Sequence, residues 1–379
     1  MNLSWLLCFH LLITAVSSDV GENGQYVLQK AGRDVIRPKV FILSTFAPEA
    51  NAWYQGSSLD LFANNITIPG LSPIWPDVHC DSGGEVCQLT TGLGVVNAAA
   101  SLTVLWSSPR FDLRKTYFLI AAIAGINPHE ATITSVTFAP YVVTLDTQYA
   151  ASALEIPNNY SSGWLPLRSE LPDTTDPAAY PTLIFGWEAF ELNAKLMRRA
   201  MAAARKAKLE DTPATKVYRA LYDYAPANEP PGIVSCVSGA SNAYWAGHAY
   251  GEAFQNYTRL MTNGSGTYCA TNTEDSGIHE ALVRGHVAGK LDYSRVINMR
   301  TASNFDRPPP GVGALSQLLY RNQGGHEPAL KNIYLAGIEV VRDVVDNWNG
   351  IFEGGIKPDN YIGDMFGSIK NQAAPRDLG

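Results

Sequence analysis

The chain has 379 residues, of which 46% are hydrophobic and 17% are charged. This composition is typical of a soluble globular protein with a large core. Its formal net charge of −7 argues against nucleic acid or an anionic membrane as a partner, because both are bound by clusters of Lys and Arg.

The N-terminus carries an export pattern. Residues 3–16 form an apolar run that is too short to span a bilayer, and small residues follow it. This pattern predicts a secretory signal peptide over residues 1–18, with a membrane anchor as the alternative, although no Lys or Arg precedes the run. Residues 19–38 are polar and are predicted to form an N-terminal arm. The length of the rest allows one large α/β domain or two smaller ones. No later apolar run is long enough to predict a membrane-spanning segment.

Two further features agree with a secreted protein, located outside the cell or in the cell wall. Four N-x-S/T sequons predict glycosylation at Asn65, Asn159, Asn256 and Asn263. The mature chain keeps four cysteines, which predict the disulfides Cys80–Cys87 and Cys236–Cys269 in an oxidising compartment. Two other pairings and four free thiols remain as alternatives. The cysteine spacing fits no zinc pattern, so no metal site is predicted.

In chain order, strands and helices alternate. Short apolar runs predict strands at residues 39–45, 86–91, 116–124, 132–143 (one strand or a pair), 232–238 and 294–301. Helical spacing predicts a short helix that opens at Pro48 and longer helices at residues 95–106, 187–208, 242–260, 276–290 and 329–347. Residues 56–84 are predicted to be mostly loop, and residues 146–182 a long surface excursion. This alternation indicates an α/β fold with a mainly parallel sheet.

The stretch from residue 89 to residue 101 has the pattern of a strand end, a Gly-X-Gly turn and an Ala-rich helix. Gly92 and Gly94 permit positive φ and a close approach of a ligand to the backbone. The free N–H groups at the start of the helix suit an anion or an oxygen-rich sugar. The motif lacks the third glycine of a dinucleotide fingerprint and the P-loop lysine, so a simple tight turn is an equal alternative.

Polar residues follow several of the predicted strands, where ligands bind in parallel sheets. Four of them are carboxylates: Glu49, Glu274, Asp275 and Asp306. Glu274 and Asp275 also suit simple helix capping. Tyr244 and Trp245 follow a strand-end Ser-Gly and either pack in the core or stack on a flat base.

Taken in order, these strand-end segments resemble the nucleoside phosphorylase and methylthioadenosine nucleosidase superfamily, and most closely its fungal branch, the purine nucleoside permease family. The resemblance covers about residues 39–350 and implies a single domain over residues 39–379. It implies a three-layer α/β fold with a mixed, mainly parallel central sheet flanked by helices. It also implies a purine nucleoside or purine base as the ligand, no cofactor, and a homo-oligomer as the assembly.

The resemblance implies roles for individual residues. Glu49 takes the place of the glutamate that positions the attacking water, and Glu274 that of the glutamate that holds the ribose hydroxyls. Asn304 takes the place of an aspartate that protonates purine N7. The residues that the resemblance places at the substrate are Ser44, Thr45, Thr91, Gly92, Gly94, Gly125, Tyr244, Trp245, Thr273, Glu274, Asp275, Arg300 and Ser303.

Three departures from the family pattern limit the functional prediction. Asn304 cannot give up a proton at neutral pH but can hydrogen-bond N7 and a 6-oxo group, which favours hypoxanthine or guanine, and Asp306 is the alternative acid. No arginine for phosphate lies beside Thr91, so hydrolysis and phosphorolysis, with inorganic phosphate as co-substrate, both stay open. The family is named for permeases, yet the sequence predicts no membrane-spanning segment that could form a pore.

We therefore predict a secreted protein that cleaves the N-glycosidic bond of purine nucleosides, as a nucleosidase or a phosphorylase, and so supports nucleoside uptake. A non-catalytic nucleoside-binding component of transport is the alternative. A storage or surface glycoprotein with a vestigial site is a third reading.

Overall fold

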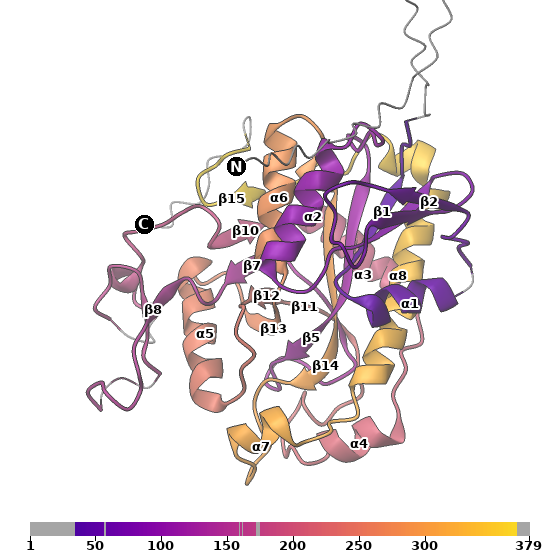
Figure 1. The fold of residues 1–379 in the computed structure, drawn as a ribbon. Helices are drawn as coiled ribbons and strands as arrows, with labels where there is room; N and C mark the ends of the chain where they lie inside the picture. Colours follow the sequence, from indigo (N-terminus) through magenta and orange to yellow (C-terminus); the bar gives the residue numbers. More distant parts are fainter. Residues whose placement is uncertain (1–34, 57, 159, 161, 172–174, 370–379) are drawn as a thin grey trace, which may run out of the picture. The chain divides into compact units, whose positions relative to one another are not determined.

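A mixed β-sheet with helices on both faces organises the chain (Figure 1). The computed structural model describes residues 35–369 apart from 57, 159, 161 and 172–174. The predicted signal peptide and most of the predicted arm lie outside these residues. The helices are α1 (Ala47–Gln55), α2 (Val95–Ser107), α3 (Ala194–Ala204), α4 (Pro213–Arg219), α5 (His248–Met261), α6 (Asp275–Val287), α7 (Ala314–Leu319) and α8 (His326–Asp346).

The sheet runs in the order β15-β10-β7-β12-β13-β5-β1-β4-β3-β2, and β14 joins it through β5 and β6. Its strands are β1 (Val40–Ser44), β2 (Asn64–Thr67), β3 (Asp77–Cys80), β4 (Val86–Thr90), β5 (Tyr117–Ile126), β6 (Val136–Phe138), β7 (Tyr141–Thr144), β10 (Ala189–Glu191), β11 (Ile233–Ser235), β12 (Val237–Ala240), β13 (Tyr268–Asn272), β14 (Val296–Phe305) and β15 (Gly363–Asp364). A separate hairpin pairs β8 (Gln148–Ala150) with β9 (Trp164–Pro166). Strands β4, β1, β5 and β14 run parallel to one another, which confirms the predicted α/β class.

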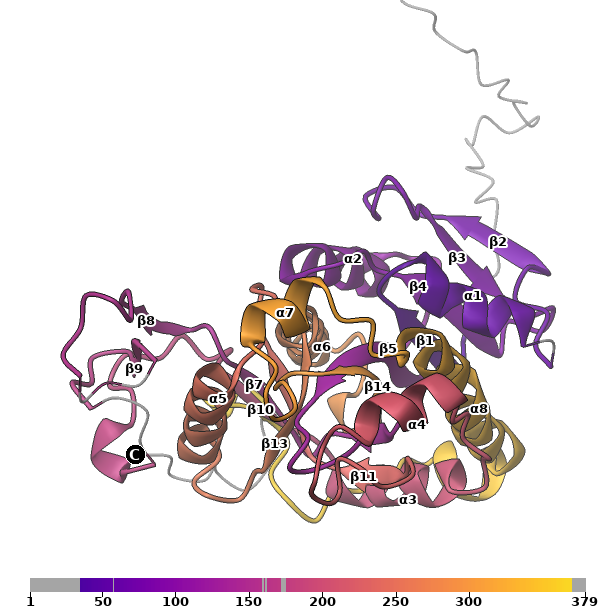
Figure 2. The same ribbon diagram turned by 90° about the horizontal axis from the view of Figure 1, so that it is seen from below.

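The two faces of β1 show how the layers form. Phe41 and Leu43 pack with residues of α2 and α6, whereas Val40 and Ile42 pack with residues of α1, α3 and α8. Successive side chains of a strand point to opposite faces, so a continuous apolar run is what a strand covered on both sides requires. Figure 2 shows α2 on one side of the sheet and α3, α4 and α8 on the other.

The prediction that residues 56–84 are mostly loop is wrong in part, because β2 and β3 extend the sheet there. Only one side chain of β2 is buried, so its sequence carries little apolar alternation. Cys80 lies opposite Cys87 across β3 and β4, and the two form the predicted disulfide. The second predicted disulfide, Cys236–Cys269, is also present and links the start of β12 to β13.

Two predicted helices begin later than expected. Residues 187–193 contain β10, and α3 starts only after Asn193, whose side-chain oxygen accepts hydrogen bonds from the amides of Lys195 and Leu196. Helix α5 starts after Gly247, which has a φ of 132°. Residues 241–247 therefore form a loop, and this loop becomes one wall of the site described below.

Other elements were missed or misjudged in length. The predictions omitted strand β13 and the short helices α4 and α7. Helix α4 did have a start signal in the sequence, since Thr212 caps it and Pro213 begins it. Strand β14 continues to Phe305, four residues beyond its predicted end, and so carries residues 302–305 to the edge of the sheet. Residues 132–143 form the pair β6 and β7, one of the two predicted alternatives.

Candidate active site

A pocket of about 260 Å³ lies at the carboxyl ends of β1, β5, β13 and β14. The loop of residues 241–247 and helix α7 form its sides. The residues that line it are Thr45, Phe46, Glu49, Leu93, Ile123, Ala124, Gly125, Ala243, Tyr244, Trp245, Thr271, Asn272, Thr273, Glu274, Ser303, Asn304 and Leu318. This is the edge of the sheet at which α/β proteins bind their ligands.

Glu49 is a buried carboxyl group on the wall of the pocket. One of its oxygens accepts hydrogen bonds from the amide and the hydroxyl of Thr45, at 2.6 and 2.8 Å, and the other accepts one from the amide of Ile123 at 2.7 Å. Burial raises the pKa of Glu49 to about 7, against the opposing effect of the Arg300 charge. Such a group exchanges protons near neutral pH, as a general base or acid must.

Glu274 is the second buried carboxylate of the pocket. The amide of Gly94 donates to its Oε1 at 3.1 Å, and the hydroxyl of Thr273 donates to the same oxygen. Two nitrogens of Arg300 donate to its Oε2, each at 3.3 Å. The Gly-X-Gly turn therefore positions this side chain, and Gly92 and Gly94 have φ values of 92° and 85°, as the sequence predicted they could.

Arg300 and Asp275 form a buried ion pair behind the pocket. The guanidinium donates to Asp275 at 2.5 Å, and also to Glu274 and to the backbone oxygen of Ile123. Burial alone would raise the pKa of Asp275, but the Arg300 charge holds it below its usual value. Neither residue lines the pocket, although the resemblance placed both at the substrate.

A polar network fixes Asp275 from the other side. Its carboxylate accepts hydrogen bonds from Ser238 at 2.6 Å and from Asn298 at 2.8 Å. The Asn298 amide also lies 3.1 Å from His279, whose other ring nitrogen lies 2.8 Å from the hydroxyl of Tyr293. Burial lowers the pKa of His279 to about 4, so this imidazole is neutral at physiological pH. This buried network fixes the position of Asp275, which in turn binds Arg300.

Asn304 lines the pocket at the end of β14. Its side-chain oxygen accepts a hydrogen bond of 2.8 Å from Ser303, while its amide nitrogen lies 3.4 Å from the backbone oxygen of Phe305. A Cβ on Gly125 would lie 2.6 Å from the Thr271 methyl group, so any larger residue at this point of β5 would require Thr271 to shift.

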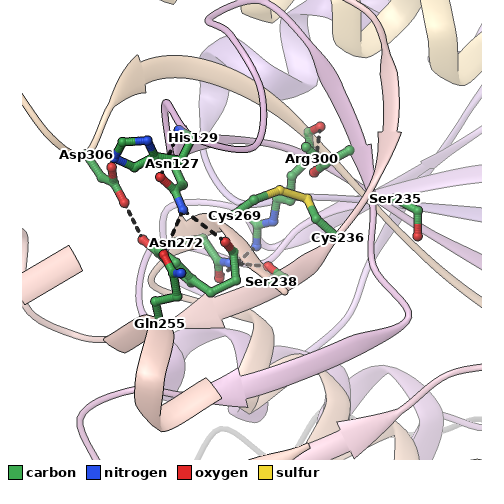
Figure 3. Close-up of a disulfide and its surroundings, with 12 residues drawn as sticks. Asn127, His129, Ser235, Cys236, Ser238, Gln255, Cys269, Asn272, Arg300 and Asp306 are labelled. Carbon is green, nitrogen blue, oxygen red and sulfur yellow. Dashed lines mark hydrogen bonds between the residues drawn. A yellow bond between two sulfur atoms is a disulfide. The ribbon is translucent and has the colours of Figure 1, made fainter. Parts of the chain in front are cut away.

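Asp306 does not line the pocket. Figure 3 draws it among the residues that surround the Cys236–Cys269 disulfide. Its carboxylate accepts a hydrogen bond of 2.7 Å from the hydroxyl of Tyr268 and lies 3.8 Å from Arg307. Strand β14 ends at Phe305, so the alternation that brings Asn304 to the pocket does not continue to Asp306. Burial raises the pKa of Asp306 to about 6, but the structure gives this group no contact with the pocket.

Apolar side chains surround the mouth of the pocket. Tyr244 is 76% exposed, and Leu93 and Leu318 are partly exposed, whereas Trp245 is buried against Phe254. An exposed tyrosine at a pocket rim is free to stack on a flat ligand. The sequence did not point to Leu318, which lies on the unpredicted helix α7. Nor did it point to Phe46 and Leu93, whose only signal was their position beside predicted residues.

The predicted residues thus divide into two groups. Nine line the pocket: Thr45, Glu49, Gly125, Tyr244, Trp245, Thr273, Glu274, Ser303 and Asn304. Seven lie outside its lining: Ser44, Thr91, Gly92, Gly94, Asp275, Arg300 and Asp306. The Thr91 amide donates to the backbone oxygen of Ser44, so β1 and β4 meet directly behind the pocket.

The fold and the site define an α/β protein with a small-molecule pocket that has two buried carboxyl groups and an apolar rim. Among the described residues, no group of His, Cys, Asp and Glu side chains is arranged to hold a metal ion. Nor does any helix in the described part of the chain combine the length and the apolarity needed to cross a membrane.

The chain belongs to the purine nucleoside permease family, whose model matches residues 37–357. It is 40% identical over 341 residues to a purine nucleoside permease of Candida albicans, and this alignment covers 88% of this chain and 82% of the relative. It is 38% identical over 343 residues to a probable purine nucleoside permease of Schizosaccharomyces pombe, and this alignment covers 89% of this chain and 96% of the relative.

Solved structures with a similar fold share little sequence with this chain. A 5′-methylthioadenosine/S-adenosylhomocysteine nucleosidase of Neisseria meningitidis aligns with a TM-score of 0.48 and 12% identity, over 82% of this chain and all of that one. A futalosine hydrolase of Helicobacter pylori aligns with a TM-score of 0.46 and 13% identity, over 82% of this chain and 98% of that one.

Proposed function

We propose that this pocket binds a purine nucleoside and that the chain cleaves its N-glycosidic bond. The observation that carries the proposal is Glu49, a buried carboxyl group on the pocket wall with a pKa near neutrality. The membership of a family named for purine nucleosides supports the choice of ligand.

The chemistry needs one group for the nucleophile and one for the leaving base. Glu49 removes a proton from the attacking hydroxyl group as the bond to the anomeric carbon forms. Asn304 donates a hydrogen bond to N7 of the departing base and so stabilises the charge that develops there. Each such contact typically supplies a rate factor of about 10² to 10⁴.

Glu274 is the residue that would hold the ribose. Its two oxygens already accept four hydrogen bonds, two from Arg300, one from Gly94 and one from Thr273. Four is about the number that a carboxylate can accept. A ribose hydroxyl therefore takes the place of the Thr273 hydroxyl, which is the one donor of the four that can rotate away.

The test is direct turnover. The purified mature protein is incubated with inosine, guanosine and adenosine, and the free base is followed by chromatography. Glu49→Gln should lower kcat at least 100-fold, while Glu280→Gln, on the same protein but outside the pocket, should leave it unchanged. No release of base from any of the three nucleosides would refute the proposal.

A non-catalytic nucleoside-binding protein is the second candidate, and Asn304 is the observation that favours it. The pocket has an amide where the related enzymes are expected to carry an acid, and Asp306 does not reach it. Calorimetry separates the two functions: saturable binding of inosine with no free base after long incubation supports binding alone.

We also propose that the protein is secreted. Both disulfides support an oxidising compartment. The sequon residues Asn65 and Asn263 are exposed, whereas Asn256 is half-buried and Thr258 of the same sequon is fully buried; Asn159 lies outside the described residues. Glycans are therefore expected at Asn65 and Asn263 and not at Asn256, which mass spectrometry before and after glycosidase treatment would show.

A further inference from the structure

The charged side chains that line the pocket are all of one sign. Among the described residues that line it, the charged side chains are Glu49 and Glu274, and none is Lys, Arg or His. A pocket that holds a phosphate ion ordinarily offers an arginine, a lysine or a set of free backbone amides.

Arg300, a cation that contacts a lining residue of the pocket, is already paired with two carboxylates. The side chain of Arg300 is 1% exposed and binds Glu274 and Asp275 at the same time. Burial opposes its charge, but these two carboxylates raise the pKa of Arg300. A phosphate could reach this guanidinium only by displacing a buried carboxylate, which would then lose its partner.

The first two amides at the N-terminus of α2, which could bind an anion, already have partners. The amide of Gly94 donates to Glu274, and the amide of Val95 lies 3.5 Å from the side-chain oxygen of Asn242. Glu274 thus uses both features that would otherwise attract phosphate, the arginine and the start of α2.

From this arrangement we infer that the nucleophile is water and that the reaction is hydrolysis, not phosphorolysis. The inference rests on the proposed function and identifies water as the second substrate of that reaction. A neutral water molecule needs no cation, and Glu49 beside the pocket accepts its proton.

The step balances without a further reactant. The water oxygen forms a bond to the anomeric carbon, and the bond from that carbon to N9 of the purine breaks, with its electron pair going to the base. One proton of the water goes to Glu49. The purine anion leaves with a hydrogen bond from Asn304 and is protonated by solvent. The products are free ribose and the purine base.

The experiment compares acceptors. The mature protein is assayed with inosine in phosphate-free buffer and again with 10 mM phosphate, with sodium chloride added to match the ionic strength. The sugar product is identified by phosphorus NMR and by a reducing-sugar assay, and a parallel reaction in ¹⁸O-labelled water is analysed by mass spectrometry. A separate calorimetric titration measures the binding of inorganic phosphate alone.

We expect rates that differ by less than twofold between the two buffers, free ribose that carries the label, and no saturable binding of phosphate. Release of base that depends on phosphate and yields ribose 1-phosphate would overturn the inference while leaving glycosidic cleavage intact. Saturable phosphate binding that competes with inosine would also overturn it. No cleavage in either buffer would overturn the proposed function, and the inference with it.

Discussion

In the proposed mechanism, cleavage should depend on pH through a single carboxyl group, that of Glu49. The ionised form is the base, and burial raises the pKa of this group to about 7. A group with that pKa is about one tenth ionised at pH 6 and about nine tenths ionised at pH 8, so kcat should rise about tenfold between these two values. A carboxyl group with the ordinary value of 4.5 would be ionised throughout this range and would give a flat profile.

The assay is the initial rate of hypoxanthine release from saturating inosine, in overlapping buffers of constant ionic strength. Glu49→Gln removes the titrating group, so its residual activity should not vary across the same range. A wild-type profile that is flat, or that falls as the pH rises, would refute the assignment of Glu49 as the base.

The same group should also affect stability. The pKa of Glu49 is raised on folding, so its contribution is present below the unfolded value of 4.5 and is lost as the pH rises through about 7. The difference of about 2.5 units corresponds to about 3 kcal/mol in the free energy of unfolding. Urea unfolding of the wild type and of Glu49→Gln at several pH values would isolate this term, because Asp306 and the other groups are common to both.

Three further predictions concern other parts of the site. Arg300→Met leaves two buried carboxylates without their cation, so it should lower the free energy of unfolding by about 3–5 kcal/mol in a urea titration. The control is Arg284→Met, which breaks an exposed ion pair and should lower the free energy of unfolding by less than about 1 kcal/mol. Asn304→Asp supplies a proton donor and should move the adenosine-to-inosine ratio of kcat/KM towards adenosine by at least about tenfold; an unchanged ratio would contradict a contact with the base. Tyr244→Ala removes a mostly exposed ring, so the Kd for inosine should rise about fivefold, equivalent to about 1 kcal/mol of stacking, with no change in the melting temperature.

The sequence was informative where the chain is buried on both sides. Strands β1 and β5 are nearly continuous apolar runs, and β4 is buried along its whole length although it contains Gln88 and Thr90. The ends of these three strands position Thr45, Thr91 and Gly125 at one edge of the sheet. Elements with little burial carried no such signal. Edge strand β2 exposes three of its four side chains, and α7 buries only Gln317. Neither segment therefore shows the apolar periodicity that predicts a strand or a helix.

Contacts between residues that are far apart in the chain could not be predicted from the sequence either. The separation of 180 residues between Gly94 and Glu274 hides the fact that the turn binds the protein's own carboxylate. The same limit applies to Asp306, which is two residues from Asn304 in the chain but contacts Tyr268 instead of the pocket. A motif could identify the residue types, but only the pairing of β5 with β13 and β14, and the packing of α5 on β13, decides which of them a ligand can reach.

Asn304 should determine which of the bound nucleosides are also cleaved. An amide cannot protonate the leaving base, so the base must depart as an anion that a hydrogen bond stabilises. A 6-oxo purine spreads that negative charge onto its oxygen, and the adenine ring has no such group. The same pocket should therefore cleave inosine and guanosine while holding adenosine with little turnover. One chain would then act as a hydrolase towards some purine nucleosides and as a binding protein towards others, and comparing the kcat of inosine with the Kd of adenosine on a single preparation would reveal both behaviours.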